Sequence, residues 1–498
     1  MQKLLFIPFI FFSSCLFAQT MLTPSEEKKF AKVTSYDELT GFINQLDEAG
    51  NLLNTEIIGQ STQGRNIYAL KLSTTVFGND PSKIKVLIFA QQHGNEQSGK
   101  EGALLLAREL IKPENRYLFD RIEIAIVPQV NPDGSELNKR RNANQIDLNR
   151  NHLILTEPET TALHTFFDKY LFEVSMDVHE YSPYSEDWKK NGIRKNSQVT
   201  LGTTTNLNVS GKIRDFSGKK ALPYLLDYLY ARNFSSFVYC PGDVPGSGYT
   251  RHSTFDINDG RQSFGIQNTL SFIQEGMNGT DNFTENLETR AISQMTGMRG
   301  LLEFAYNYKK AIVNIVSSER KKLSEESSDK SVSIQSEHIR NGRSLLLPVF
   351  SYMTGKDSIV EVKDYRPVVS SITDVRKPFG YLIPADLTEI TDWTDRQGLV
   401  QLAFQPGPKD IIEQYLVQRF DSIDFEGDTI ANPIVEVRIL QPEQLQGKYI
   451  FISTAQLKGN LAVIALEPKS MLGLVTYEKY RHLLKQGEAF PILRVMKK

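Results

Sequence analysis

Short apolar runs alternate with helix-like segments between residues 22 and about 320. The β-branched runs "NIYALKL" (66–72) and "IKVLIFA" (84–90) are typical of strands, and "GKEGALLLARELI" (99–111) has the apolar spacing of a helix. Further segments of these kinds occupy 121–130, 158–171 and 172–179. Because strands that alternate with helices build a sheet covered by those helices, the sequence predicts an α/β domain with a mixed central sheet flanked by helices.

The chain changes character after a long helical pattern that covers about 295 to 326. A polar stretch, "SEESSDKSVSIQSE", follows, and from residue 341 onward short apolar runs are separated by proline and glycine. We expect one catalytic domain over 22–322, a helix end and linker over 323–340, and a smaller, mainly β domain over 341–498.

The first residues, "MQKLLFIPFIFFSSCLFAQT", are typical of a secretory signal, with Lys3 before an apolar run and Ala18 before a polar stretch. The run is shorter than the roughly 20 apolar residues that span a membrane. We expect a signal peptide over 1–18 and an exported protein, periplasmic or secreted, without a transmembrane span. A buried first strand and a lipoprotein acylated at Cys15 are the alternatives.

Charge and cysteine content narrow the choice of partners and metal ligands. The formal net charge of -2 gives no reason to expect a nucleic acid as partner. The two cysteines, Cys15 and Cys240, lie far apart, so neither a disulfide framework nor a thiolate zinc site is predicted. A metal ion would have to be held by histidine and carboxylate.

Three residues with metal-binding side chains lie at predicted strand ends. His93 and Glu96 follow the strand 84–90, and His179 ends the strand 172–179. Two histidines and one carboxylate, with a position left for water, are typical of a catalytic zinc site. Ligands bind beyond the carboxyl ends of strands in such sheets, which favours this interpretation over a polar loop. Asp147 and Asp177 could accept hydrogen bonds from the outer ring nitrogens.

Two further features could act beside such a metal. The segment "KRRNANQIDLNRNH" (139–152) has three arginines and four asparagines, and guanidinium groups bind carboxylates and stabilise oxyanions. Glu275 ends the strand-like run "TLSFIQE" and could take a proton from water. A solvated basic loop and an ordinary strand-end glutamate are the alternatives for these two features.

Together these motifs resemble the zinc metallocarboxypeptidase family, the carboxypeptidase A-like peptidases. "GQSTQGRNIYALKL", "HGNE", "NPDG" followed by "RRNANQIDLNRN", and "MDVHE" occur in the family's order within residues 50 to about 280. The resemblance implies the family's fold and one Zn²⁺ ion. It also implies His93, Glu96 and His179 as metal ligands, Glu275 as general base, Arg140 (or the adjacent Arg141) as carbonyl-polarising group, and Asn149, Arg150 and Tyr249 as substrate-binding residues.

The expected function is hydrolysis that releases C-terminal residues from a peptide with a free C-terminus. A zinc amidohydrolase or endopeptidase acting on cell-wall peptide or a small acyl-amino acid is one alternative, and a non-catalytic peptide-binding protein is another. The sequence departs from the family at His152, where an aromatic residue is usual. For the C-terminal domain, a role in shaping the cleft and a role as a wall- or sugar-binding module both stay open.

Overall fold

The computed structural model describes residues 21–281, 283–325, 330–407, 410–425, 427–445 and 447–497. The predicted signal peptide over 1–18 lies outside these ranges. Within them, no helix combines the length and the apolar character that crossing a bilayer requires.

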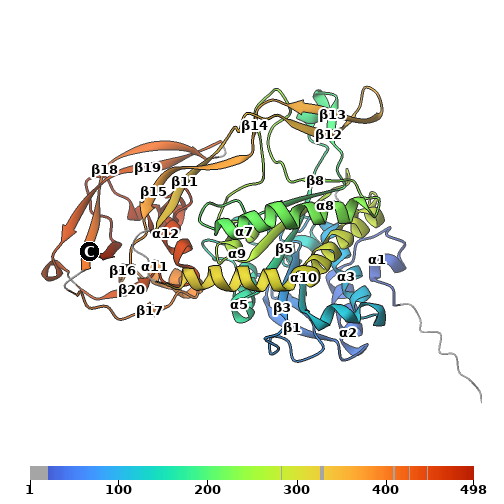
Figure 1. Cartoon of the computed structure of the whole chain (residues 1–498), viewed down its shortest axis with the longest axis horizontal. Coiled ribbons are helices and arrows are strands. Elements are labelled where there is room, and N and C mark those ends of the chain that lie inside the picture. Colours follow the sequence, from blue (N-terminus) through green and yellow to red (C-terminus); the bar gives the residue numbers. More distant parts are fainter. Residues whose placement is uncertain are drawn as a thin grey trace, which may run out of the picture.

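An eight-stranded mixed sheet forms the centre of the N-terminal part (Figure 1), in the order β1-β2-β4-β3-β5-β10-β7-β8. The four central strands β4, β3, β5 and β10 are parallel, whereas β1, β2 and β7 join by antiparallel pairing. Every residue of β4 is buried, as expected for a strand covered on both faces. The strands are β1 (Leu53–Gln60), β2 (Asn66–Leu72), β3 (Ile84–Ala90), β4 (Ile122–Val127), β5 (Val174–Tyr181), β7 (Val199–Thr203), β8 (Ser236–Val238) and β10 (Leu270–Met277).

Helices cover both faces of this sheet, which confirms the predicted α/β fold. Side chains alternate along a strand, so Val86 and Ile88 of β3 face one core and Leu87 and Phe89 face the other. The first core is completed by α2 (Tyr36–Glu48), α3 (Gln97–Leu110), α8 (Leu222–Tyr230) and the long α10 (Leu287–Leu323); the second by α5 (Pro158–Tyr170) and α9 (Gly260–Gly265).

The C-terminal part is mainly β, as predicted. Its six-stranded sheet has the order β17-β20-β16-β21-β18-β19, and a separate ribbon joins β11 to β15. The bounds are β11 (Ser331–Ile339), β15 (Val368–Arg376), β16 (Gly380–Pro384), β17 (Gln401–Leu402), β18 (Asp410–Phe425), β19 (Asp428–Leu440), β20 (Tyr449–Ser453) and β21 (Leu493–Lys497), with α11 (Thr388–Arg396) and α12 (Gly459–Leu466) packed beside them.

Strand β11 corrects the expectation of a linker over 323–340. Residues 331–339 pair antiparallel with β15, and the side chains of Val332 and Ile334 are buried. The apolar residues of "SVSIQSEHI" alternate with polar ones, which is the pattern of a half-buried strand. The serines around them gave the segment the composition of a loop.

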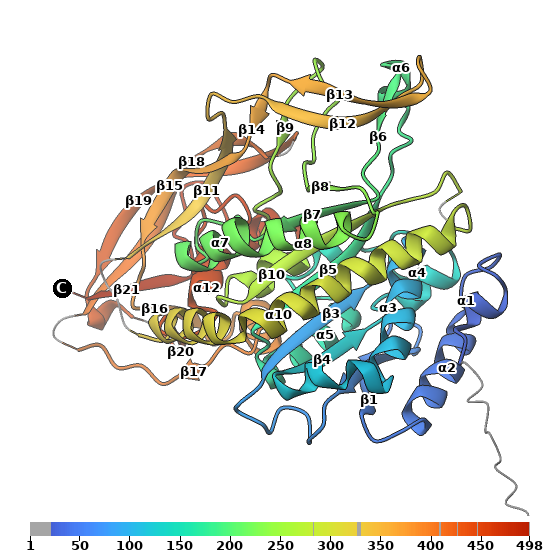
Figure 2. The ribbon, with the colours of Figure 1, turned by 45° about the vertical axis from the view of Figure 1, so that its right-hand side comes forward.

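The C-terminal part packs against the N-terminal part through an apolar core and through strand pairing. One apolar core contains Leu153 together with Trp393, whose Nε1 donates to the Leu153 carbonyl at 2.8 Å. Strand β12 (Leu345–Ser351) pairs with both β13 (Lys356–Val362) and β6 (Ile193–Lys195), and β14 (Tyr365–Arg366) pairs with β9 (Thr250–Arg251). Figure 2 shows β12 and β13 reaching over to β6 and α6 (Glu186–Lys190).

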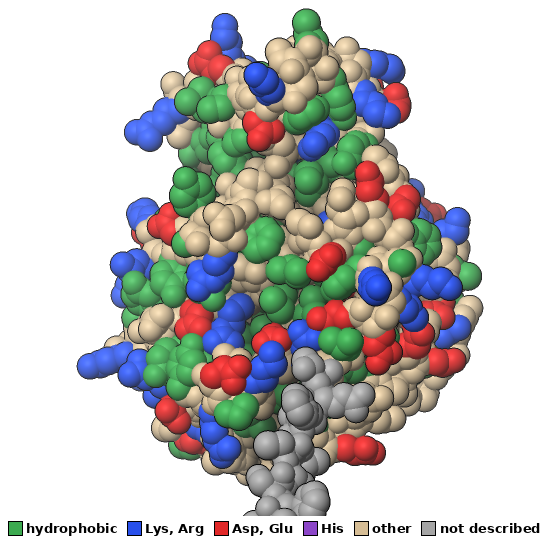
Figure 3. Space-filling model, turned by 90° about the vertical axis from the view of Figure 1, so that its right-hand side faces the viewer, with side chains coloured by type: hydrophobic (Ala, Val, Ile, Leu, Met, Phe, Trp, Pro, Cys, Tyr) green, Lys and Arg blue, Asp and Glu red, His purple; other side chains and the backbone are tan. Residues whose placement is uncertain are grey.

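Figure 3 shows how side chains are distributed on one face of the molecule. Positive and negative side chains are interspersed over the body, and hydrophobic side chains gather beneath the upper lobe. That lobe contains β12, β13 and α6 (Figure 2).

Candidate active site

The carboxyl ends of the parallel strands bring the predicted site residues together. His93 and Glu96 lie in the segment between β3 and α3, and His179 lies near the end of β5. Strands β5 and β10 are hydrogen-bonded neighbours, and their register sets Glu275 directly beside His179. The four residues therefore meet at one edge of the sheet although 182 positions separate the first from the last.

The segment that carries His93 and Glu96 packs tightly against the short helix α4 (Pro132–Glu136). A Cβ atom on Gly94 would lie 2.1 Å from the carbonyl carbon of Gly134, so only glycine fits there. Asn131 caps α4 by accepting a hydrogen bond from the Gly134 amide at 2.9 Å. The "NPDG" sequence is thus the capped start of a helix that supports the segment carrying His93 and Glu96.

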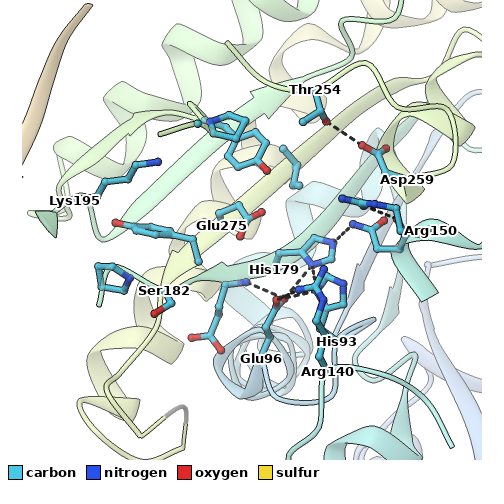
Figure 4. Close-up of a pocket in the computed structure, with 18 of the residues that line it drawn as sticks. His93, Glu96, Arg140, Arg150, His179, Ser182, Lys195, Thr254, Asp259 and Glu275 are labelled. Carbon is cyan, nitrogen blue, oxygen red and sulfur yellow. Dashed lines mark hydrogen bonds and ion pairs between the residues drawn. The ribbon is translucent and has the colours of Figure 1, made fainter. Parts of the chain in front are cut away.

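His93, Glu96 and His179 form a buried group of potential metal ligands. Their ligand atoms all lie within 4.8 Å of one another. The Glu96 carboxylate is 2.8 Å from His93 Nδ1 and 2.9 Å from His179 Nδ1, and the two Nδ1 atoms are 3.2 Å apart (Figure 4). Both rings therefore turn the same nitrogen toward one point, as a shared metal ion requires.

The outer nitrogens of both rings have carboxylate partners. His93 Nε2 is 3.1 Å from Asp147, and His179 Nε2 is 2.8 Å from Asp177, so both predicted acceptors are in position. Such partners fix the ring orientation and make a histidine a better ligand. This donor set, two histidines and one carboxylate with a second layer of carboxylates, fits zinc.

Electrostatics at the site favours charged carboxylates. Burial opposes ionisation of Glu96, but His93 and His179 hold its pKa well below the usual range. Burial likewise disfavours a charge on Asp147, yet His93 and Arg140 keep its pKa low. Glu96 therefore offers an ionised carboxylate to the group.

Glu275 faces the same cavity, but its pKa is raised whereas that of Glu96 is lowered. Burial raises its pKa to about 7, and the nearby charge of Glu96 acts in the same direction, against His179. It lines the cavity beside the metal-ligand group without being one of its members. A buried carboxylate with a pKa near neutrality is suited to accept and return a proton.

The two candidate arginines of the 139–152 segment differ in position. Arg140 lines the cavity, and its guanidinium bonds Asp147 at 2.9 Å and lies 3.7 Å from Glu96. Arg141 instead donates to the Gln145 carbonyl at 2.9 Å. Arg140 is therefore the arginine that can reach an oxygen beside the metal-ligand group.

Asn149 and Arg150 lie on a short 3-10 turn (Leu148–Arg150), and the Asn149 amide donates to the side chain of Asp147, which caps the turn. The Asn149 side-chain oxygen accepts from the Gly260 amide at 2.8 Å, and an Arg150 guanidinium nitrogen donates to the Asn149 carbonyl at 2.8 Å. Both residues line the cavity, so the turn presents an amide and a guanidinium group side by side.

The cavity has a volume of about 390 Å³. Its remaining wall contains aromatic, polar and charged residues that the sequence did not single out: Tyr181, Trp188, Lys195, Tyr239, Thr254 and Asp259. Tyr181 could have been found, because it follows His179 by two positions on one strand and so shares its face. Lys195 has no such signal in the sequence.

Tyr249 is the predicted site residue that the structure does not bring to this cavity. Its ring packs under the Arg366 guanidinium, 4.2 Å from the centroid, in a separate hollow beside the C-terminal part. The reason is the pairing of β9 with β14, which ties the following residues, Thr250 and Arg251, to the C-terminal chain.

His152, the departure from the family pattern, is buried behind the site. It contacts Gln92 at 2.6 Å and His164 at 2.9 Å, and Gln92 in turn donates to Asp177. Burial lowers the pKa of His152 to about 4. It acts as a neutral hydrogen-bonding residue beneath the metal-ligand group and does not line the cavity.

The comparisons with known proteins all find carboxypeptidases. Residues 39–190 match the model of the family described as zinc carboxypeptidase. "Carboxypeptidase 2" of Trichophyton rubrum is 23% identical over 476 residues, which cover 93% of this chain and 86% of that protein. Human "Carboxypeptidase D" is 29% identical over 167 residues, 28% of this chain and 12% of its own. A solved metallo-carboxypeptidase from Burkholderia cenocepacia covers 55% of this chain and 69% of its own, with 20% identity and a TM-score of 0.43.

Proposed function

Because this chain belongs to the zinc carboxypeptidase family, we propose that it releases C-terminal residues from peptides, with one zinc ion held by His93, Glu96 and His179. The observation that carries the proposal is the buried group of these three side chains, which shares one cavity with Glu275, Arg140 and Arg150.

Glu275 is the proposed general base. Bound zinc would lower the pKa of a coordinated water and polarise the attacked carbonyl. The Glu275 carboxylate takes the proton of the attacking water and later gives it to the leaving amine, so no covalent intermediate is needed. The raised pKa of this buried carboxylate supports both halves of that transfer.

Arg140 would stabilise the negative charge that develops on the carbonyl oxygen. Its guanidinium lies 3.7 Å from Glu96 and so next to the metal-ligand group, and Asp147 holds it there. Donors fixed in position before the reaction lower the barrier because they do not have to reorganise.

Asn149 and Arg150 would bind the terminal carboxylate of the substrate. The guanidinium and the amide lie together on the 3-10 turn at the cavity wall. A guanidinium beside an amide selects chain ends over chain interiors, because an internal peptide brings no carboxylate for the guanidinium to bind.

The test compares one peptide as free acid and as C-terminal amide, each with wild type and Arg150→Ala. We expect wild type to prefer the acid strongly in kcat/KM, because the clamp also sets the geometry of attack. The Arg150→Ala variant should lose most activity on the acid, and its kcat/KM values for the acid and the amide should differ less than those of the wild type. Equal rates of the wild type on acid and amide would contradict the proposal and indicate an endopeptidase or amidase.

A further inference from the structure

Lys195 is a cation of the cavity wall that the proposed mechanism does not use. It ends strand β6, and its ammonium donates to the Cys240 carbonyl at 2.7 Å. The same nitrogen lies 5.3 Å from the centroid of the Trp188 ring. Among the described residues it has no carboxylate partner in an ion pair, although it lines the cavity that contains Glu275.

Four other charged residues of the cavity already have partners. Glu180 pairs with Arg290 at 2.8 Å, and Asp259 pairs with Arg261 at 2.8 Å. Glu96 belongs to the metal-ligand group, and Arg140 pairs with Asp147. Lys195 is left with one neutral acceptor and an aromatic face.

Burial lowers the pKa of Lys195, while Cys240 and Glu275 act against that shift. A partly desolvated ammonium with few hydrogen-bond acceptors is stabilised when a bound ligand places an anion beside it.

Lys195 lies on the opposite side of the cavity from Arg150. In Figure 4, Glu275 and His179 stand between these two cations. If Arg150 binds the carboxylate of the departing residue, the rest of the bound peptide must extend from the metal-ligand group toward the opposite side of the cavity. The residue that supplies the attacked carbonyl then comes next to Lys195.

We propose that Lys195 binds a carboxylate on the residue that supplies the attacked carbonyl, so that the enzyme prefers peptides with an acidic penultimate side chain. This inference rests on the proposed function. The preference for an acidic side chain is thus placed on the Lys195 side of the cleft, opposite the proposed position of the C-terminal carboxylate.

The C-terminal part holds Lys195 in place. Lys195 pairs with Val349 of β12, and the neighbouring Arg194 pairs with Phe350. Trp188, beneath the ammonium, belongs to an apolar cluster with Val349 and Leu347. The C-terminal part thus shapes the cleft by completing the sheet that carries the cation.

The experiment uses two peptides that differ only in glutamate or glutamine at the penultimate position. Wild type should show at least about tenfold higher kcat/KM for glutamate, as expected for a close, desolvated charge pair. Lys195→Met should remove this preference and keep activity on the glutamine peptide, whereas Lys195→Arg should retain part of it. Equal rates of the wild type on both peptides, or an unchanged ratio in Lys195→Met, would overturn the inference.

Two further arms separate the inference from the proposed function. Lys189→Met removes an exposed cation of α6 nearby and should leave the ratio unchanged. Binding of both peptides to zinc-loaded Glu275→Gln protein, with and without Lys195→Met, reports on the anion site without turnover. Tighter binding of the glutamate peptide that requires Lys195 supports the inference even if the wild type cleaves neither peptide, a result that would count against the proposed function. Equal binding overturns the inference.

Discussion

At the residue scale, the site depends on which nitrogen each histidine turns inward. His93 and His179 both direct Nδ1 to Glu96 and Nε2 to a carboxylate, Asp147 or Asp177. The outer carboxylates select the tautomer, so the inner nitrogens keep their lone pairs for a metal ion. Each aspartate therefore orients one of the two histidines that we propose as metal ligands.

The pH dependence of activity should report on Glu275. As the proposed base, Glu275 must be ionised, and burial raises its pKa to about 7, so activity should fall as the pH drops through the pKa of this group. A cation bound nearby favours the carboxylate, so we expect the acid limb of kcat/KM between the ordinary value of about 4.3 and about 7.

The Glu275→Gln variant is the control for this assignment. Its amide keeps the shape of the side chain but cannot accept the proton, so we expect at least about 100-fold lower turnover with full zinc content. Zinc analysis of His179→Ala, which removes a proposed ligand, should show loss of the metal instead. Activity of Glu275→Gln within about tenfold of wild type would mean that another group is the base.

At the element scale, the site exists because the segment after β3 meets helix α4. The Cβ of an alanine at position 94 would lie 2.1 Å from the backbone of Gly134 and 2.3 Å from that of Ser135. Backbone cannot rotate away as a side chain can, so the segment carrying His93 and Glu96 would have to move.

We predict that Gly94→Ala costs about 1–3 kcal/mol of stability, as overpacking does, and lowers zinc affinity. The matched control is Gly41→Ala in helix α2, where a Cβ meets nothing within 4 Å and should stabilise by about 0.5–1 kcal/mol. Urea unfolding and zinc titration of both variants provide the measurement. Unchanged stability and zinc binding in Gly94→Ala would refute the steric argument.

At the scale of the whole molecule, the two parts share an apolar core. Trp393 is fully buried in this core and bonds the Leu153 carbonyl, three residues beyond Arg150. The C-terminal part therefore supports the wall that carries the proposed carboxylate clamp, and it also pairs with β6 and β9.

We expect the protein to unfold as one cooperative unit. Trp393→Ala should lower the stability of that unit by about 3–5 kcal/mol, the usual cost of removing a buried aromatic side chain. Tyr230→Ala, at a 78% exposed aromatic residue of α8, should change it little. Scanning calorimetry that resolves two separate transitions, with only one shifted by Trp393→Ala, would contradict this expectation.

The sequence by itself determined the central strands and the residues at their ends. Hydrophobic runs such as "IKVLIFA" are local signals, and His93 and Glu96 follow directly from where the run stops, as His179 does on β5. Because parallel strands end at one edge of a sheet, local patterns were enough to bring these ligands together with Glu275.

Only the tertiary structure decided what depends on pairing between distant segments. Tyr249 faces away from the cavity because β9 pairs with a strand more than 100 residues later, and Lys195 faces into it on a strand held by β12. Neither pairing leaves a local pattern, since a two- or three-residue strand is too short to show periodicity. The direction in which such a side chain points is fixed by the hydrogen bonds and packing that join two distant segments. Its neighbours in the sequence do not fix it.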